Sequence, residues 1–63
     1  MKLLKITELK SAKNIGFSRG HLYRLIAAGK FPKPIRLGEN RIMFVESEID
    51  AWLLERIAER DAN

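Results

Sequence analysis

Hydrophobic and polar positions along the chain recur with the spacing of short helices, and the first such segment follows Thr7. Leu9 and Ala12 stand three residues apart, as on the inner face of a helix. Thr7 is a residue type that caps helix N-termini, so we predict a first helix from Thr7 to about Asn14. Gly16 fits the left-handed position that commonly ends a helix.

A second helix is predicted directly afterwards. Ser18 is well placed to accept hydrogen bonds from the free amides of its first turn. Leu22, Leu25 and Ile26 then share one side of the helix, and Gly29 ends it. The two helices are joined by the tight turn "NIGFS".

The segment "PIRLGENRIMFV" predicts a hairpin over about 34–45. Ile35 and Leu37 flank Arg36 in strand alternation, "GEN" supplies the turn, and "RIMFV" returns. Two strands alone are marginal in water, so the hairpin must pack on the helices and its tip should project. Near the start, "LLKI" predicts a short extended lead-in.

The last helix is predicted over about 47–60, with Ser47 as its cap and Asp50 completing a partial capping box. Its apolar residues recur at the spacing of a stripe that faces a core. Trp52 is the largest of them and is the expected anchor of the core, whereas Leu54 falls off the stripe and is expected to be exposed. The stripe consists of Ile49, Trp52, Leu53 and Ile57.

Helix, tight turn, helix, hairpin and helix is the order of elements in a winged helix-turn-helix domain. We therefore predict a mainly α fold with a small β-hairpin, that is, three helices and a two-stranded wing. A chain of 63 residues makes one domain. The predicted single domain 1–63 contains the helix-turn-helix over about 7–29, the wing over about 34–45 and the C-terminal helix over about 47–60.

Charge is divided unevenly along this chain. Residues 1–45 hold ten Lys and Arg against two acidic residues, 10 − 2 = +8, whereas residues 46–63 hold two against six, 2 − 6 = −4. A basic part beside an acidic part is typical of a nucleic-acid binder with a separate outer element. A solvated mixed-charge surface is the alternative interpretation.

The sequence lacks the residues that several other classes of protein require. The chain has no cysteine and one histidine, which excludes a disulfide framework and a closed zinc site. No nucleophile has a paired base and no Gly-rich loop could cradle a phosphate, so we predict neither an enzyme nor a cofactor. Charged residues interrupt the apolar start, and no stretch is long enough to span a membrane. A cytoplasmic, nucleoid-associated protein is expected.

The polar residues at the start of the second helix are the candidate DNA contacts. At about 100° per residue, Gly20 and Arg24 point away from the apolar side, and Arg19 and Tyr23 lie on one shoulder. Arg24 can donate two hydrogen bonds to guanine. Lys33 would add nonspecific attraction. The predicted DNA-binding residues are Ser18, Arg19, Gly20, Tyr23, Arg24, Lys30, Arg36, Asn40 and Arg41.

The stretch "GFSRGHLYRLIAAGKFPKPIRLGENRIMFVESEIDAWLLERIAER" resembles the AlpA family of small phage and prophage regulators, which is related to excisionases and to the MerR-type winged helix. The matching features are the Gly-apolar-Ser-Arg turn, "LYRLI", "G-K-FP-KP" and "ESEIDAWL", and the likeness covers about residues 4–60. It implies a DNA-binding regulator of phage genes or an excision factor. In that resemblance Ser18, Arg19, Tyr23 and Arg24 match the recognition-helix motif, and Arg41 falls in the wing.

Two departures from the family pattern concern base choice and the wing. Gly20 and His21 stand where the family commonly has Ser or Thr, and Glu39 places an acid at the wing tip, against deep insertion into the minor groove. A domain this small makes few base contacts, so we expect self-association or cooperative binding on repeated sites of double-stranded DNA. An integrase or RNA polymerase is a further expected partner.

A protein-interaction adaptor is the main alternative, because winged helices also serve as adaptors. If the basic side chains form one free surface, DNA binding is favoured; if ion pairs to the acidic tail consume them, the adaptor is favoured. RNA binding is less well supported, since no exposed aromatic pair on a sheet is evident.

Overall fold

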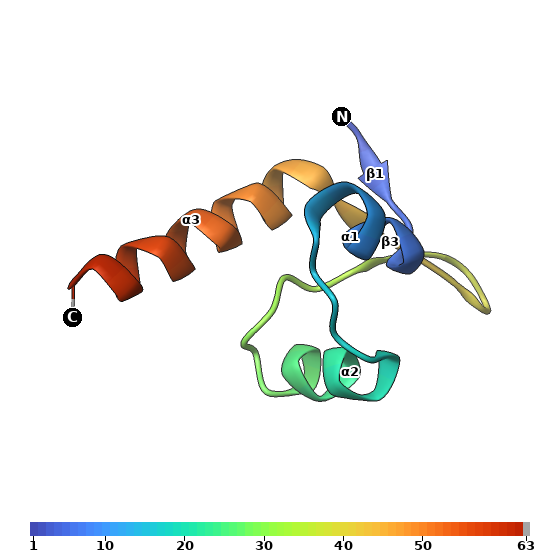
Figure 1. Ribbon diagram of the computed structural model, residues 1–63. Coiled ribbons are helices and arrows are strands. Elements are labelled where there is room, and N and C mark those ends of the chain that lie inside the picture. Colours follow the sequence, from blue (N-terminus) through green and yellow to red (C-terminus); the bar gives the residue numbers. More distant parts are fainter. Residues whose placement is uncertain (63) are drawn as a thin grey trace.

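The computed structural model describes residues 1–62 and contains three helices and a three-stranded antiparallel sheet (Figure 1). This is the mainly α arrangement with a small β component that the sequence predicts. The elements are β1 (Leu3–Leu4), α1 (Ile6–Lys13), α2 (Arg19–Ala27), β2 (Ile35–Gly38), β3 (Arg41–Val45) and α3 (Glu46–Ala62).

The predicted hairpin forms from β2 and β3, and β1 adds a third strand that was not predicted, so the sheet has the strand order β1-β3-β2. The lead-in pairs with the free edge of β3, with Leu3 opposite Val45 and Leu4 opposite Phe44. Leu4 and Phe44 are fully buried, and this burial of apolar surface explains why the lead-in joins the sheet. β2 remains an exposed edge strand on the other side.

α1 begins earlier than predicted, because its start is set by Glu8 rather than by Thr7. The Glu8 carboxylate accepts a hydrogen bond from the Lys5 backbone N–H at 2.9 Å, and the Glu8 N–H donates to the Lys5 carbonyl at 3.0 Å. These two bonds make Lys5 the N-cap and Ile6 the first helical residue. The prediction that Thr7 caps this helix is therefore wrong.

The end and the inner face of α1 also differ from the prediction. Asn14, with φ 58°, takes the left-handed position that we assigned to Gly16. Asparagine tolerates that conformation better than most residues, and its N–H donates to the Lys10 carbonyl at 3.0 Å. Leu9 is buried, but Ala12 is exposed.

α2 forms as the sequence predicts. The Ser18 hydroxyl oxygen accepts a hydrogen bond from the His21 N–H at 3.2 Å, which confirms Ser18 as the N-cap. Leu22 is buried, and Leu25 and Ile26 pack against the core. Gly29, with φ 72°, ends the helix while its N–H donates to the Ile26 carbonyl at 3.1 Å.

α3 follows β3 without a break, so the predicted cap at Ser47 is wrong. The helix begins at Glu46, whose N–H donates to the Lys2 carbonyl at 2.9 Å. The Lys2 carbonyl thus satisfies the first amide of the helix, which would otherwise need a capping side chain. The helix continues to Ala62, and its second half extends away from the other elements (Figure 1).

The core lies where α1, α2 and the first half of α3 meet β1 and β3. Its buried members are Leu4, Leu9, Ile15, Leu22, Phe31, Phe44 and Ile49.

Two residues of the predicted α3 stripe are more exposed than expected. Trp52 is only partly buried, so the fully buried anchor is Phe44 rather than Trp52, and Ile57 is 45% exposed because it lies beyond the body of the molecule. Leu54 is exposed, as predicted.

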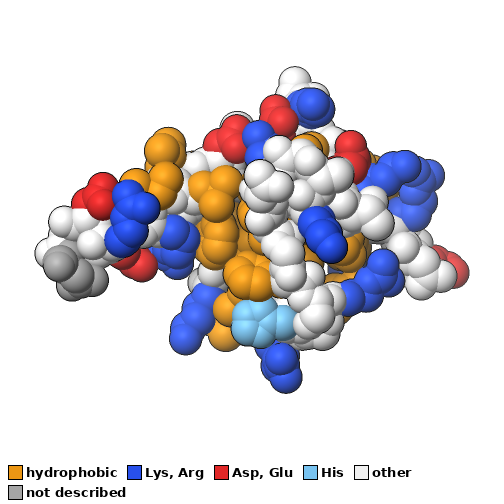
Figure 2. Space-filling view, viewed as in Figure 1, with side chains coloured by type: hydrophobic (Ala, Val, Ile, Leu, Met, Phe, Trp, Pro, Cys, Tyr) orange, Lys and Arg blue, Asp and Glu red, His pale blue; other side chains and the backbone are white. Residues whose placement is uncertain are grey.

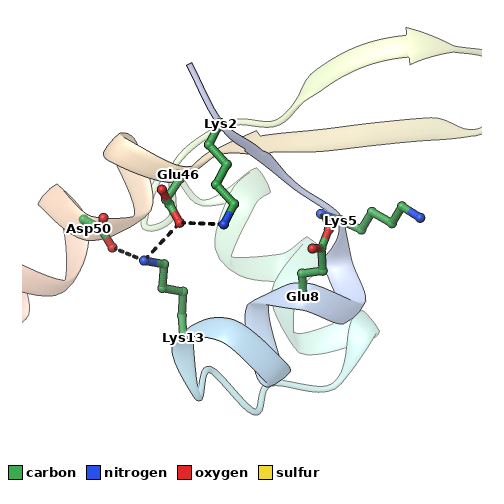
Figure 3. A network of polar contacts seen from close by, with 6 residues as sticks. All are labelled: Lys2, Lys5, Glu8, Lys13, Glu46 and Asp50. Atoms are coloured by element: carbon green, nitrogen blue, oxygen red, sulfur yellow. Dashed lines mark hydrogen bonds and ion pairs between the residues drawn. The ribbon is translucent and has the colours of Figure 1, made fainter.

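A cluster of ion pairs connects α1 with the start of α3 (Figure 3). The Lys13 Nζ lies 2.8 Å from Asp50 Oδ1 and 3.4 Å from Glu46 Oε2, and the Lys2 Nζ lies 3.8 Å from the same Glu46 oxygen. The hydrogen bond with Asp50 is the main cause that raises the pKa of Lys13 above its ordinary value. Acidic side chains of α3 are thereby held toward α1.

Candidate nucleic-acid interface

The first turn of α2 presents its polar side chains to solvent. Arg19, Gly20, Tyr23 and Arg24 are all exposed. At 45% exposure, Tyr23 is more exposed than any Phe or Trp of the chain. A Cβ added to Gly20 would have no heavy atom within 4 Å and its φ is ordinary. Nothing inside the protein therefore requires glycine at this position.

The β2–β3 hairpin projects from the body beside α1 (Figure 1). Arg36 pairs with Ile42 and Gly38 with Arg41, and the register shifts between Arg36 and Gly38. An irregularity of this kind bends a strand and increases its twist. Asn40, in the tip, and both arginines are exposed, as a projecting hairpin requires.

A groove of about 260 Å³ separates α2 from the hairpin. It brings together four of the predicted site residues, two from each element: Arg19, Tyr23, Asn40 and Arg41. Ser18, Gly20, Arg24 and Arg36 are exposed outside it. The predicted residues thus divide between this groove and surfaces outside it.

Lys5 and Thr7 also line the groove, and sequence reasoning missed both. They reach it because the start of α1 lies against β3 and next to α2. Thr7 had been assigned to helix capping, and Lys5 to the lead-in. The basic and hydroxyl character of this short segment was the available signal, but its position depends on how α1 packs against the sheet.

A second groove, of about 430 Å³, lies between the segment after α2 and α3. Lys30 and Lys33 line it together with Glu48, Glu55 and Arg56. Trp52 lines it as well, and its Nε1–H donates to the Lys30 carbonyl at 2.9 Å. Lys30 is therefore placed apart from the groove that Arg19 and Arg41 share, and its surroundings carry mixed charge.

Within the described residues 1–62, no ion pair joins an acidic side chain of α3 to one of the predicted DNA contacts. Among residues 1–62, the acidic side chains of α3 pair with four other cations: Lys2, Lys13, Arg56 and Arg60. Within the same residues, none of Arg19, Arg24 and Arg41 forms an ion pair. Figure 2 shows Lys and Arg side chains along the edge from α2 to the hairpin, and acidic side chains mainly elsewhere, apart from the hairpin tip.

Two further properties concern metals and membranes. Across residues 1–62, no group of three or more His, Asp or Glu side chains is arranged to hold a metal ion. None of the helices in this part of the chain has the length and apolar character needed to cross a membrane.

Comparison with known proteins gives two matches. Residues 2–57 match the family described as prophage CP4-57 regulatory protein (AlpA). The chain is also similar to the uncharacterized protein ORF88 of Enterobacteria phage P4, with 42% identity over 45 residues, which are 71% of this chain and 51% of that protein. The chain thus spans about half the length of the curated relative that it matches. No solved structure matches the chain.

Proposed function

The chain belongs to the AlpA family of prophage regulatory proteins, and from that premise we propose that it is a winged helix-turn-helix protein that binds double-stranded DNA sequence-specifically. The observation that carries this proposal is the free basic surface of α2 and the hairpin. Arg19, Arg24 and Arg41 are exposed and, within residues 1–62, form no ion pair with the acidic helix. Such a surface attracts a phosphate backbone.

In this proposal α2 enters the major groove, which is about 12 Å wide and admits a helix. Arg24 would donate two hydrogen bonds to a guanine, a contact that discriminates against other bases by roughly 1–3 kcal/mol. Gly20 lets the backbone of α2 approach the DNA closely, because no side chain intervenes. Ser18, Arg19 and Tyr23 then fix the helix on the backbone phosphates.

The hairpin serves as the wing. Arg41 and Asn40 would contact the DNA backbone beside α2, and Arg36 would add a contact from β2. Glu39 at the tip opposes deep insertion into the minor groove, where the phosphates on both sides repel a carboxylate. Lys30 and Lys33 would contribute nonspecific attraction from the other side of α2.

A protein-interaction adaptor is less well supported than a DNA-binding protein. That alternative requires the basic side chains to be consumed by the acidic tail, whereas the carboxylates of Glu46 and Asp50 pair with Lys13. The apolar side chains of Leu54 and Ile57, exposed on the projecting part of α3, are compatible with protein contacts in addition to DNA binding.

Regulation of prophage genes, excision of the prophage, or both would follow from where the DNA sites lie. A single small module buries limited surface on DNA, so we propose cooperative binding on repeated sites. An integrase or RNA polymerase is the proposed protein partner at those sites. The protein would then act in the cytoplasm, on the bacterial nucleoid.

The test is selection from a pool of randomised duplexes at low and at physiological salt, followed by sequencing of the bound fraction. We expect an enriched motif. Arg24→Lys keeps the charge but loses the planar fork, so it should relax base choice at one motif position while leaving the salt dependence unchanged. Lys33→Ala is the matched comparison and should weaken binding to all sequences about equally. Retention of no duplex at either salt would refute DNA binding.

A further inference from the structure

The groove between α1, α2 and the hairpin contains cationic and neutral polar groups from three separate elements. Lys5 and Thr7 come from the start of α1, Arg19 and Tyr23 from α2, and Arg41 from the hairpin. These segments are distant in the sequence and meet only in the folded chain. We propose that this groove holds a phosphate of the DNA backbone, with Lys5 and Thr7 acting as DNA contacts beside Arg19 and Arg41. This inference rests on the proposed function.

The chemistry of the lining matches a phosphodiester. Among the lining residues that the structure describes, three side chains carry positive charge, three supply neutral polar groups, and none is acidic. The second groove, by contrast, combines its cations with Glu48 and Glu55. Apolar side chains of Ile6, Ile42 and Met43 form the remainder of the lining. A backbone phosphate carries one negative charge and several oxygens that accept hydrogen bonds, so it satisfies these donors. Hydrogen bonds between charged partners are stronger than those between neutral groups.

The ammonium group of Lys5 is available for this contact. Figure 3 shows the Lys5 side chain extended away from Glu8, whose carboxylate is turned toward the backbone of Lys5. That carboxylate accepts the Lys5 N–H at 2.9 Å, so it supports the start of the helix. Within residues 1–62, the Lys5 ammonium forms no ion pair, unlike the Lys2 ammonium 3.8 Å from Glu46.

Thr7 is free for the same reason that it fails as a helix cap. The cap position belongs to Lys5, which leaves the Thr7 hydroxyl without a hydrogen bond in the described residues 1–62. Its carbonyl, not its hydroxyl, accepts the hydrogen bond from Ser11 at 3.4 Å. A threonine hydroxyl at the edge of a cationic groove is a suitable donor to a phosphate oxygen.

The groove and the outward face of α2 would therefore have different tasks. Contacts to phosphate fix position and register without reading sequence, whereas contacts to base edges specify it. Arg24 lies outside the groove and is free to read a base while Arg19 and Lys5 hold the backbone. A phosphate contact from α1 would also restrain the angle between α2 and the DNA.

The experiment measures the dissociation constant of the full chain as a function of salt, on the enriched duplex and on a scrambled duplex. Lys5→Gln should weaken binding to both duplexes by the same factor, about eightfold at 0.1 M salt if one counterion is no longer released, and should reduce the salt slope by about 0.9. Arg60→Gln removes the same charge from the far end of α3 and should leave the slope unchanged. Thr7→Val should weaken binding to both duplexes without changing the slope, because the lost donor is neutral.

The outcomes separate the two proposals. Circular dichroism of each variant first verifies that the fold is retained. If the parent binds the enriched duplex specifically but Lys5→Gln has the parent's affinity and slope, the phosphate site is refuted while the DNA-binding function stands. An equal loss of slope in Arg60→Gln would also refute it, because the effect would then come from net charge. If the parent binds neither duplex, the proposed function itself fails.

Discussion

Replacing Trp52 by alanine removes the side chain that ties α3 to the segment following α2. The indole ring lies 4.8 Å from the Phe31 ring and 6.4 Å from the Phe17 ring, measured between centroids. Its Nε1–H donates to the Lys30 carbonyl at 2.9 Å, and the Arg56 guanidinium lies 5.5 Å from its centre. Alanine keeps none of these contacts.

The expected loss of stability follows from this environment. A fully buried Phe or Trp costs about 3–5 kcal/mol when it is replaced by alanine. Trp52 is partly exposed, so we expect about 3 kcal/mol, of which roughly 1 kcal/mol is the hydrogen bond to Lys30. At about 0.05–0.15 kcal/mol per residue, a domain of this size has a total stability of roughly 3–9 kcal/mol. The substitution should therefore remove a third or more of it.

Urea unfolding followed by circular dichroism measures this change, since the variant has no tryptophan left to fluoresce. Trp52→Phe keeps an aromatic ring but loses the donor, and should cost about 1–2 kcal/mol. Leu54→Ala is the matched control on the same helix, because Leu54 is 67% exposed and should change stability by no more than about 0.5 kcal/mol. If Trp52→Ala costs no more than Leu54→Ala, the role assigned to the indole ring is refuted.

Three further predictions concern single positions. Gly29→Ala should lower the free energy of unfolding in urea by about 1–2 kcal/mol, because the φ of Gly29 is 72°. Gly16→Ala should be neutral or should raise it by up to about 1 kcal/mol. If Gly16→Ala were the more destabilising of the two, the observed helix ends would be contradicted. Gly20→Ala should raise stability by up to about 1 kcal/mol yet weaken binding to the enriched duplex, and unchanged binding would rule out close approach of the backbone. The pKa of Lys13 is raised in the folded chain, so its ion pairs stabilise the fold fully below pH 10.5, and this stabilisation is lost as the pH rises through the folded-state pKa. Lys13→Met should therefore lower the melting temperature at neutral pH, and its difference from the parent should narrow above pH 10.5.

The parts of the fold that were predicted correctly depend on neighbouring residues. Ser18 caps α2 and Gly29 ends it because the bonds that satisfy each end lie within the same few residues. Thr7 failed as a cap because Glu8, three residues from Lys5, satisfies the Lys5 amide and makes Lys5 the N-cap. Ser47 failed for a non-local reason, because a carbonyl of the N-terminal segment, 44 residues away in the chain, accepts the first amide of α3. Local spacing contains no information about such a distant partner.

The candidate site shows the same division. The helical period alone places Arg19 and Tyr23 on one shoulder of α2, and they do lie together in the groove. The period cannot indicate that Lys5 faces them, because that juxtaposition depends on the packing of α1 against β3. Nor could composition show which carboxylates form ion pairs, because the pair of Lys13 with Asp50 requires the start of the third helix to lie near the end of the first.

Stability and recognition use separate side chains in this small domain, and that separation determines how binding experiments can be interpreted. Among residues 1–62 the buried residues are all apolar, and none of the proposed DNA contacts is among them. Surface substitutions at Arg24, Arg41 or Lys5 should therefore change the free energy of unfolding by no more than about 0.5 kcal/mol. A loss of affinity in these variants then reports a lost DNA contact rather than a lost fold. A substitution at Phe17, by contrast, should change the free energy of unfolding, because its partly exposed ring still contacts Phe31.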